Sequence, residues 1–512
     1  MKEINRYLLT KSDFADFVNE EDQLLKDFLL DYDFSRDIRK NLIEYVNEFM
    51  SSFNDNLKIF VEFPYVDKLY RNSYYHYFSS KLTNISRDCM RLNFFKSVIE
   101  PDCFYSGDQK FLQNSYLGYL VLRPLYKRWI GRNLLSPAIL KNSNIECCQI
   151  NEEVSVNGIK LIASGFPHQS QDGEYCSCAE TTIWSLIEYY SHAFPEFSSA
   201  LIGDINSTSD FLKYDRNLPS NGFSLFEISQ ILKQFGFNTK VHSIKKDCEL
   251  DDQQFFRKLM NIYIQSGIPL LCSIEFDNCS FGHAVLAIGT ANTNEDIQSI
   301  YDEEDRDVDL MNLENKIVTI NDNKPPYYIV DFNHPTYDYE KPMDDSSFCG
   351  FIAPLHKKVY LSAIEAQKIS ELLFDHNKKE KNEDLYSFLG LHDDYFLQNG
   401  PIFHNLFLVT SRNFKAYIFH SEEISPALKD SLISILLPKY IWVIELSNKL
   451  LYNEKLINGF ILIDATSFIT SNDLLDNMII CYAESLFYKS NEYNESKRVF
   501  KGQKPFKRYM RN

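Results

Sequence analysis

Between residues 165 and 354, the spacing of apolar residues changes from a helical period to a strand period, and this change limits the fold more than any other feature of the chain. Apolar residues three and four apart predict a helix, whereas alternating or short continuous apolar runs predict a strand. The pattern predicts, in chain order, helices over 180–190 and 225–235, a strand over 238–243, a helix over 252–265, and strands over 270–276 and from 283 onward. Helices and strands mixed in this way indicate an α+β unit.

The length of the chain predicts more than one domain. It has 512 residues, and single hydrophobic cores stop growing near about 250–300 residues. We expect helical stripes of apolar residues over 1–90, a strand-rich passage over 116–132, a helix over 430–437, and strands over 440–446 and 459–464. The resulting prediction is a helical and β N-terminal domain over 1–160, the α+β unit over 161–360, and an α+β domain with a basic tail over 361–512.

Composition and charge narrow the class of protein. Hydrophobic residues make up 44% of the chain and aromatic residues 15%, which excludes a mainly disordered protein. The formal net charge of −18 would repel a phosphate backbone, so a general nucleic-acid binder is not expected. The basic, aromatic segment 497–512 is the one place that could bind RNA, DNA or an acidic partner. The commoner reading of such a segment is a solvated terminal extension.

No stretch of the sequence predicts a membrane span or an export signal. The longest apolar runs, 432–438 and 477–483, are far shorter than the roughly 20 residues that cross a bilayer. The N-terminus has no hydrophobic export core, so we expect a soluble, cytoplasmic protein. The 11 cysteines show no spacing typical of a disulfide framework, and most are expected to be buried thiols. The acid-rich segment 295–314 shows no apolar face and is expected to be a solvated loop insertion.

A thiol nucleophile is expected at the start of the helix over 180–190. Cys178 lies at or just before the first turn, where unpaired N–H groups and the helix dipole stabilise a thiolate. Cys176 is the alternative, but it lies further from the helix. Buried, inert thiols are the usual fate of cysteine, yet the polar loop 171–174 directly before this pair favours a reactive residue.

A candidate base follows at the start of a strand. His283 lies between Gly282 and Ala284, whose small side chains leave room for a substrate. A single histidine on a strand is more often a satisfied core residue. Together with a nucleophilic cysteine, however, it would accept the thiol proton and return it to the leaving group.

These residues carry a resemblance to a known family. The order Gln171, Cys178, His283 and a following Asp resembles papain-like thiol peptidases, and the spacing is similar to the leader-cleaving peptidase domains of bacteriocin exporters. The matching motifs are Cys178-Ala179, Tyr189-Tyr190, and the passages 266–271 and 282–285. The chain also resembles a group of uncharacterised bacterial proteins through Gln171-Asp172, Cys178-Ala179 and Trp184 after Arg123-Pro124-Leu125 and Gly131-Arg132. The family likeness covers about residues 165–335 and implies a papain-like core, in which a helix-start cysteine packs on an antiparallel sheet.

The resemblance also implies an oxyanion donor. Gln171 would donate its side-chain amide, with the Cys178 backbone N–H as the second donor. The family usually places this glutamine six residues before the nucleophile, whereas here the gap is seven. Gln169 therefore remains an alternative, and an exposed loop glutamine without a role is another.

Two aspartates compete as the residue that orients the histidine. Asp322 follows the strand expected over 316–321, and Asp331 follows the strand expected over 327–330. In the exporter domains the aspartate falls on the strand after the histidine strand, with a proline-containing turn behind it. This register favours Asp322, and the acid-rich insertion leaves Asp331 open.

The expected activity is that of a thiol peptidase or amide hydrolase with a Cys178–His283–Asp322 triad, which would act on a peptide or protein through an acyl thioester. An acyltransferase of the transglutaminase type, with the same triad, and a non-enzymatic scaffold are the alternatives. No cofactor and no metal is expected, because no Cys-x-x-Cys pair supports Cys272, Cys279 and His283 as zinc ligands. Arg123, Arg128 and Arg132 could bind an anion together, but pairing with acids is the more common arrangement.

Overall fold

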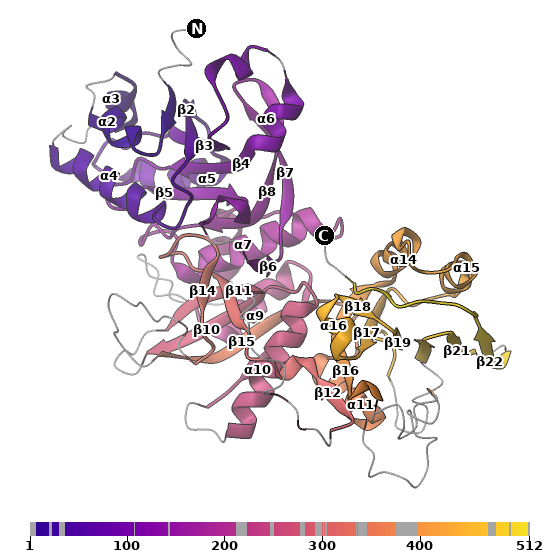
Figure 1. Cartoon of the computed structure of the whole chain (residues 1–512). Helices are drawn as coiled ribbons and strands as arrows, with labels where there is room; N and C mark the ends of the chain where they lie inside the picture. The colour runs from indigo at the N-terminus through magenta and orange to yellow at the C-terminus, as the bar shows by residue number, and fades with distance from the viewer. Residues whose placement is uncertain are drawn as a thin grey trace. The chain divides into compact units, whose positions relative to one another are not determined.

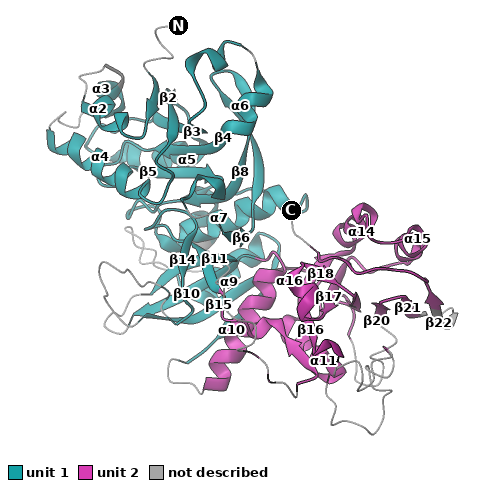
Figure 2. Cartoon of the chain, in the orientation of Figure 1, with its two compact units in different colours: residues 1–246, 269–292, 316–354 teal, residues 247–268, 293–315, 355–512 magenta. Residues whose placement is uncertain are grey.

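The structure is a computed structural model in which the chain forms two compact units (Figure 2). Unit 1 comprises residues 1–246, 269–292 and 316–354, and unit 2 comprises residues 247–268, 293–315 and 355–512. The structure describes residues 7–19, 23–29, 36–106, 108–141, 144–210, 223–245, 250–276, 282–291, 300, 302, 305–333, 335, 346–374, 389, 398–468, 478–490 and 493–509.

The first sheet of unit 1 has seven strands in the order β1-β2-β3-β4-β5-β8-β7, and each neighbouring pair is antiparallel. The strands are β1 Leu8–Thr10, β2 Leu57–Tyr65, β3 Cys89–Lys96, β4 Tyr116–Leu122, β5 Ile130–Leu135, β7 Ile150–Val156 and β8 Ile159–Gln169. The helices in this part of the chain are α2 Asp13–Asn19, α3 Gln23–Leu29, α4 Arg36–Phe49, α5 Lys68–His76 and α6 Gln109–Ser115 (Figure 1).

The all-helical prediction for residues 1–90 is wrong at β2. The centre of this strand, Ile59 to Val61, is an unbroken apolar run whose side chains are all buried. Such a short run has no helical or strand period, and pairing with β1 and β3 decides its conformation.

The second sheet of unit 1 has the order β14-β13-β11-β10-β15-β9, and β6 pairs with the side of β11. Its strands are β6 Ile145–Cys147, β9 Phe237–Ser243, β10 Leu270–Phe276, β11 His283–Ala291, β13 Lys316–Ile320, β14 Tyr328–Val330 and β15 Ser346–His356. The accompanying helices are α7 Cys178–Ala193, α8 Ile202–Asp210 and α9 Leu225–Gln234. Helices and antiparallel strands together confirm the α+β class.

Strand β8 belongs to the first sheet of unit 1, and the chain leads from it to the helix that contacts the second sheet. Its first half forms a hairpin with β7, and its last residues, from Phe166 to Gln169, pair with β5. The chain then enters a loop and begins α7, which contacts both β8 and β11. The predicted boundary at residue 160 falls inside this strand, and β6, from the N-terminal part, pairs with β11. The structure therefore places residues 1–160 in one compact unit with residues 161–246, 269–292 and 316–354 of the predicted α+β unit, whereas residues 247–268, 293–315 and 355–360 belong to unit 2.

Unit 2 is built on a sheet with the order β12-β16-β17-β19-β20-β21-β22. Its strands are β12 Asp307–Asp309, β16 Ile402–Thr410, β17 Tyr440–Ser447, β19 Gly459–Asp464, β20 Met478–Tyr482, β21 Ser485–Ser490 and β22 Tyr493–Val499, with a separate pair of β18 Leu456–Ile457 and β23 Phe506–Lys507. Its helices are α10 Leu250–Gln265, α11 Ala363–Phe374, α14 Ser411–His420, α15 Pro426–Ser434 and α16 Lys449–Asn453.

Two segments expected to be solvated are part of this unit. In the acid-rich segment, β12 pairs in parallel with β16, and Val308, Leu310 and Met311 are buried. The basic segment 497–512 supplies the end of β22 and the whole of β23, and Phe506 is buried. Among the described residues of these two segments, a few apolar side chains anchor the chain to the unit, so neither segment is solvated along its whole described length.

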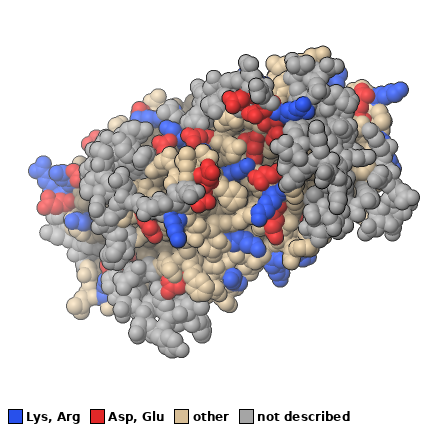
Figure 3. All heavy atoms as spheres, turned by 90° about the horizontal axis from the view of Figure 1, so that it is seen from below, with Lys and Arg blue, Asp and Glu red and all other residues tan. Residues whose placement is uncertain are grey.

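Within the described residues, no helix has both the length and the apolar character needed to cross a bilayer. On the face seen in Figure 3, Lys and Arg side chains lie interspersed with Asp and Glu side chains.

Candidate functional site

Helix α7 begins at Cys178, and its first turn is held by buried polar groups. The Ser177 N–H donates to the Glu180 carboxylate at 3.0 Å, and Glu180 is fully buried. This capping box stops the chain from fraying where the helix begins. Cys178, a free and partly exposed cysteine, is thus held at the start of the helix.

A hydrogen bond fastens the first turn of α7 to the strand that carries the histidine. The Thr182 hydroxyl donates to the Cys178 carbonyl at 2.6 Å and also lies 3.3 Å from the Ala284 carbonyl. Ala284 is the second residue of β11, directly after His283. One side chain therefore contacts the backbone of the expected nucleophile and the backbone of the residue that follows the expected base.

The His283 ring contacts two neighbouring side chains through one nitrogen. Its Nε2 lies 3.0 Å from Asn321 Oδ1 and 3.4 Å from Asp322 Oδ1, and the side chain is 12% exposed. Burial is the largest influence on the ring and lowers its pKa, but a hydrogen bond with Cys178 and the charge of Asp322 outweigh it and raise the pKa to about 9. The influence of Cys178 on this pKa indicates that its thiol lies near the ring.

Sheet pairing explains why Asn321 and Asp322 lie beside His283. Strand β13 runs antiparallel to β11, with Ile320 opposite Leu286, so the end of β13 comes to the beginning of β11. There the chain turns, with the Lys324 N–H donating to the Asn321 carbonyl at 3.1 Å. The Asn321 side-chain oxygen also accepts from the Asn323 N–H at 3.0 Å, which fixes its orientation toward the ring.

Asp322 is almost fully buried, and burial raises its pKa to about 6 against the opposing charges of His283 and Arg128. Neither of its oxygens has a hydrogen-bond partner within the described residues. Its contact with His283 is therefore chiefly electrostatic, whereas Asn321 makes the hydrogen bond. The other candidate, Asp331, has a side chain that is 48% exposed, and it lies 3.9 Å from Lys316. The structure thus brings Asp322 to the histidine and leaves Asp331 on the surface.

Asn321 was missed by the sequence reasoning, which ended the preceding strand at this residue and looked only for a carboxylate. The available signal was the run Asn321-Asp322-Asn323 at a strand end, where polar side chains of a turn gather.

The two glutamines of the preceding loop have different environments. Gln171 is partly exposed, and its side-chain amide donates to Asn323 Oδ1 at 2.9 Å, next to the His283 contacts. Gln169 is buried at the end of β8, and its amide lies 3.7 Å from Cys176 Sγ. Cys176 is itself fully buried, and burial together with the charge of Asp172 raises the pKa of its thiol well above the ordinary value. Gln169 and Cys176 thus form an internal contact, away from the partly exposed thiol.

The loop between β8 and α7 is shaped by its own backbone contacts. Asp172 Oδ1 accepts three N–H bonds, from Glu174, Tyr175 and Cys176, at 2.8–2.9 Å. From the other side, the buried Arg123 donates to the carbonyls of Ser170 and Gln171, at 3.1 and 3.2 Å. These bonds hold the Gln171 backbone in one place.

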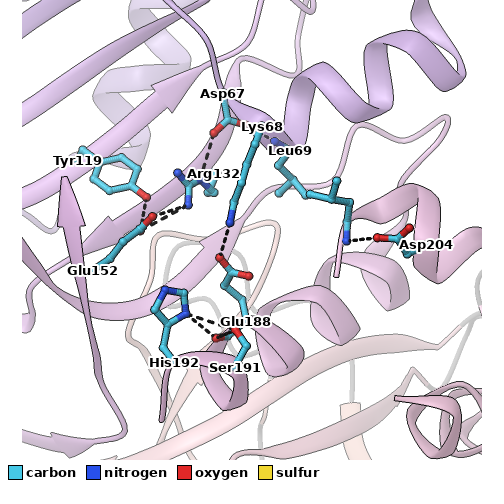
Figure 4. A network of polar contacts seen from close by, with 11 residues as sticks. Asp67, Lys68, Leu69, Tyr119, Arg132, Glu152, Glu188, Ser191, His192 and Asp204 are labelled. Carbon is cyan, nitrogen blue, oxygen red and sulfur yellow. Dashed lines mark hydrogen bonds and ion pairs between the residues drawn. The ribbon is translucent and has the colours of Figure 1, made fainter. Parts of the chain in front are cut away.

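The three arginines considered as an anion site do different things. Arg123 binds the loop carbonyls. Arg132 pairs with Asp67 and Glu152, at 3.0 and 3.1 Å, within the polar network of Figure 4. Arg128 lies over Gly173, where a Cβ atom would come within 3.3 Å of its guanidinium. A common anion site of all three is therefore wrong, because carboxylates and carbonyls already satisfy two of them.

In the described part of the chain, no group of three His, Cys, Asp or Glu side chains is arranged to hold a metal ion. Cys272 is buried in β10 and Cys279 lies outside the described residues.

Comparisons of this chain with models of known protein families and with curated proteins found no match.

Proposed function

We propose that unit 1 contains a papain-like core and that the protein is a thiol hydrolase of amide bonds in a peptide or protein. One observation gives the proposal its main support. The His283 ring is held through Nε2 by Asn321 and Asp322, and the thiol of Cys178, at the start of α7, acts to raise the pKa of this ring.

The first chemical step would use the raised basicity of the imidazole. His283 holds the proton that the Cys178 sulfur has given up, because its raised pKa favours the imidazolium, and the sulfur attacks the carbonyl carbon of the scissile amide. The electron pair of the carbonyl moves to oxygen, and the imidazolium then gives its proton to the departing amine. A thioester on Cys178 remains, and a water molecule, deprotonated by His283, hydrolyses it to the free acid.

The developing oxyanion requires two donors. The Cys178 backbone N–H belongs to the first turn of α7, whose N–H groups have no partner within the helix. The Gln171 amide carries two hydrogens, one of which is donated to Asn323. The second hydrogen is free to reach the oxyanion, so Asn323 would orient the donor.

The experiment is to incubate the full chain with a peptide library made from a protein digest, in the presence of a primary amine. The Cys178→Ala variant is the matched control. We expect new peptide ends with the unaltered chain only. Products that carry the amine would assign acyl transfer instead. A folded protein that yields neither cleavage nor an acyl adduct on Cys178 would contradict the proposal.

A further inference from the structure

His168 is a buried histidine with no part in the proposed mechanism. It contacts the turn 321–324, whose side chains contact His283. His168, in β8, is fully buried, and its Nε2 lies 3.1 Å from the Asn321 carbonyl. Its Nδ1 lies 2.7 Å from the side-chain nitrogen of Asn133, in β5. The ring therefore connects the first sheet of unit 1 with the turn of the second.

The neighbours of His168 determine which nitrogen carries the proton. The Asn133 amide nitrogen faces the Gly131 carbonyl at 3.3 Å as well as His168 Nδ1, so both of its contacts are those of a donor. Nδ1 must then accept, and the hydrogen of the neutral ring lies on Nε2. From there it points to the Asn321 carbonyl.

The ring stays neutral at physiological pH. Burial is the main cause that lowers the pKa of His168, to about 4, and the charge of Arg123 acts in the same direction, while hydrogen bonds to the backbone of Asn321 and Lys324 oppose them. The ring also packs against Phe49, with the two centroids 5.9 Å apart. It is thus a fixed donor rather than a titrating group.

We propose that His168, oriented by Asn133, is a positioning residue that sets the place of the turn 321–324 and through it the orientation of His283 and Gln171. This inference rests on the proposed function. Three side chains of this turn contact residues of the candidate site. Asn321 and Asp322 contact His283, and Asn323 accepts a hydrogen bond from Gln171. His168 lies three residues before Gln171, so one segment supplies the oxyanion donor and holds the turn that orients it.

The test compares His168→Leu, which removes the donor, with His168→Gln, whose side-chain amide can donate in its place. The first readout is the titration of His283 by NMR, and the second is the rate at which iodoacetamide alkylates Cys178 between pH 5 and 9. Tyr119→Phe is the control, because it also deletes a buried hydrogen bond in unit 1, the one to Glu152 at 2.8 Å, without contacting the turn (Figure 4).

We expect His168→Leu to lower the pKa of His283 by about one unit and to slow alkylation at pH 6 by about tenfold, because the ring loses its oriented partners. His168→Gln should restore both, and Tyr119→Phe should change the melting temperature alone. A folded His168→Leu protein with an unchanged His283 titration would overturn the inference. If His168→Leu does not fold, Asn133→Ala, which removes the bond that fixes the tautomer, is measured in the same way and judged by the same result.

The two proposals fail in different ways. If the unaltered chain cleaves no peptide, the proposed function fails. Hydrogen exchange at the Lys324 N–H, which donates to Asn321, still reports whether His168 fixes the turn: faster exchange in His168→Leu supports the positioning role, and unchanged exchange refutes it.

Discussion

Each unit contains a histidine that lies beside aspartate in a largely buried position, and comparing the two shows which further contacts make such a pair a candidate site. In unit 1, His283 Nε2 contacts Asp322 and Asn321, and the Cys178 thiol acts to raise the pKa of the ring. In unit 2, His404 lies 3.3 Å from Asp307 and 4.0 Å from Asp309, and its ring stacks on Phe374 with centroids 4.2 Å apart.

The two histidines differ in the other groups that surround their rings. Lys258 binds Asp309 at 2.7 Å, so the unit 2 cluster neutralises its own charge within the core. Its histidine joins packed elements and faces an aromatic ring. The pKa of the unit 1 histidine is raised by the thiol of Cys178, a partly exposed residue. A His–Asp pair alone therefore does not indicate catalysis, and the following predictions test that distinction.

The largest effect is expected from Cys178→Ala. We predict complete loss of peptide cleavage with a nearly unchanged melting temperature, because a partly exposed thiol fills little of the core. Cys176→Ala should keep cleavage and lose about 1 kcal/mol of stability through the cavity that it leaves. Cleavage assays and thermal melts of both variants check this, and loss of activity in Cys176→Ala alone would reverse the assignment.

The two histidines should respond in opposite ways to alanine. His283→Ala is expected to slow alkylation of Cys178 by about 10²-fold at pH 6, because the thiol loses the imidazole that takes its proton. His404→Ala should leave alkylation unchanged and lower the free energy of unfolding by about 1–3 kcal/mol, because it removes a buried, stacked ring. Equal alkylation rates in the two variants would remove the distinction between the units.

Substitutions of the two candidate aspartates should also differ in their effect on activity, but by less than those of the two histidines. Asp322→Asn should slow cleavage by about tenfold or more, because the positive charge that forms on His283 loses its buried counter-charge. Asp331→Asn should change cleavage little and stability by less than about 0.5 kcal/mol, as expected for a surface pair. Comparing kcat and melting temperature for both variants decides the matter, and a collapsed kcat in Asp331→Asn would move the orienting role to that residue.

The smallest effect is on the pH dependence of stability. The pKa of His283 in the folded protein, about 9, lies above its ordinary value of 6.5, so folding favours the protonated ring. This stabilisation is fully present below pH 6.5 and is lost as the pH rises through about 9. The pKa of Asp322 is raised from 3.8 to about 6, so the effect of this carboxyl on stability changes mainly between these two pH values, below the range in which His283 loses its proton.

Between pH 7 and 9 the unaltered chain should therefore lose on the order of 2 kcal/mol more stability than His283→Ala does. Denaturant melts of both proteins at these two pH values measure the difference, and parallel pH profiles would show that the ring does not hold its proton in the fold.

Helices and strands were predicted best where the apolar residues keep a single period and clear start and stop signals mark both ends of the segment. The strands over 270–276 and 459–464 have the predicted bounds. The helix expected over 430–437 instead begins at Pro426, because a proline in the first turn is a start signal that the apolar period alone does not reveal. The order of Cys178 and His283 was visible in the sequence, and the register of the following strands favoured Asp322.

Contacts between residues on different strands could not be predicted from the sequence. Asn321 reaches His283 only because β13 pairs with β11, and His168 reaches Asn321 only because β8 continues from one sheet toward the other. A residue spacing in one chain does not report such pairings, since strand order is decided by the packing of segments far apart in sequence.

The central claim, that Cys178 and His283 form a nucleophile and base pair, is tested most directly by the pH dependence of Cys178 alkylation. Iodoacetamide would be applied to the full chain between pH 5 and 9, and the labelled peptide quantified by mass spectrometry, with His283→Ala in parallel. We predict rapid alkylation of Cys178 that persists below pH 7 in the unaltered chain and falls with decreasing pH, as for an ordinary thiol, in His283→Ala. Identical profiles in the two proteins, or labelling of Cys176 in place of Cys178, would contradict the account.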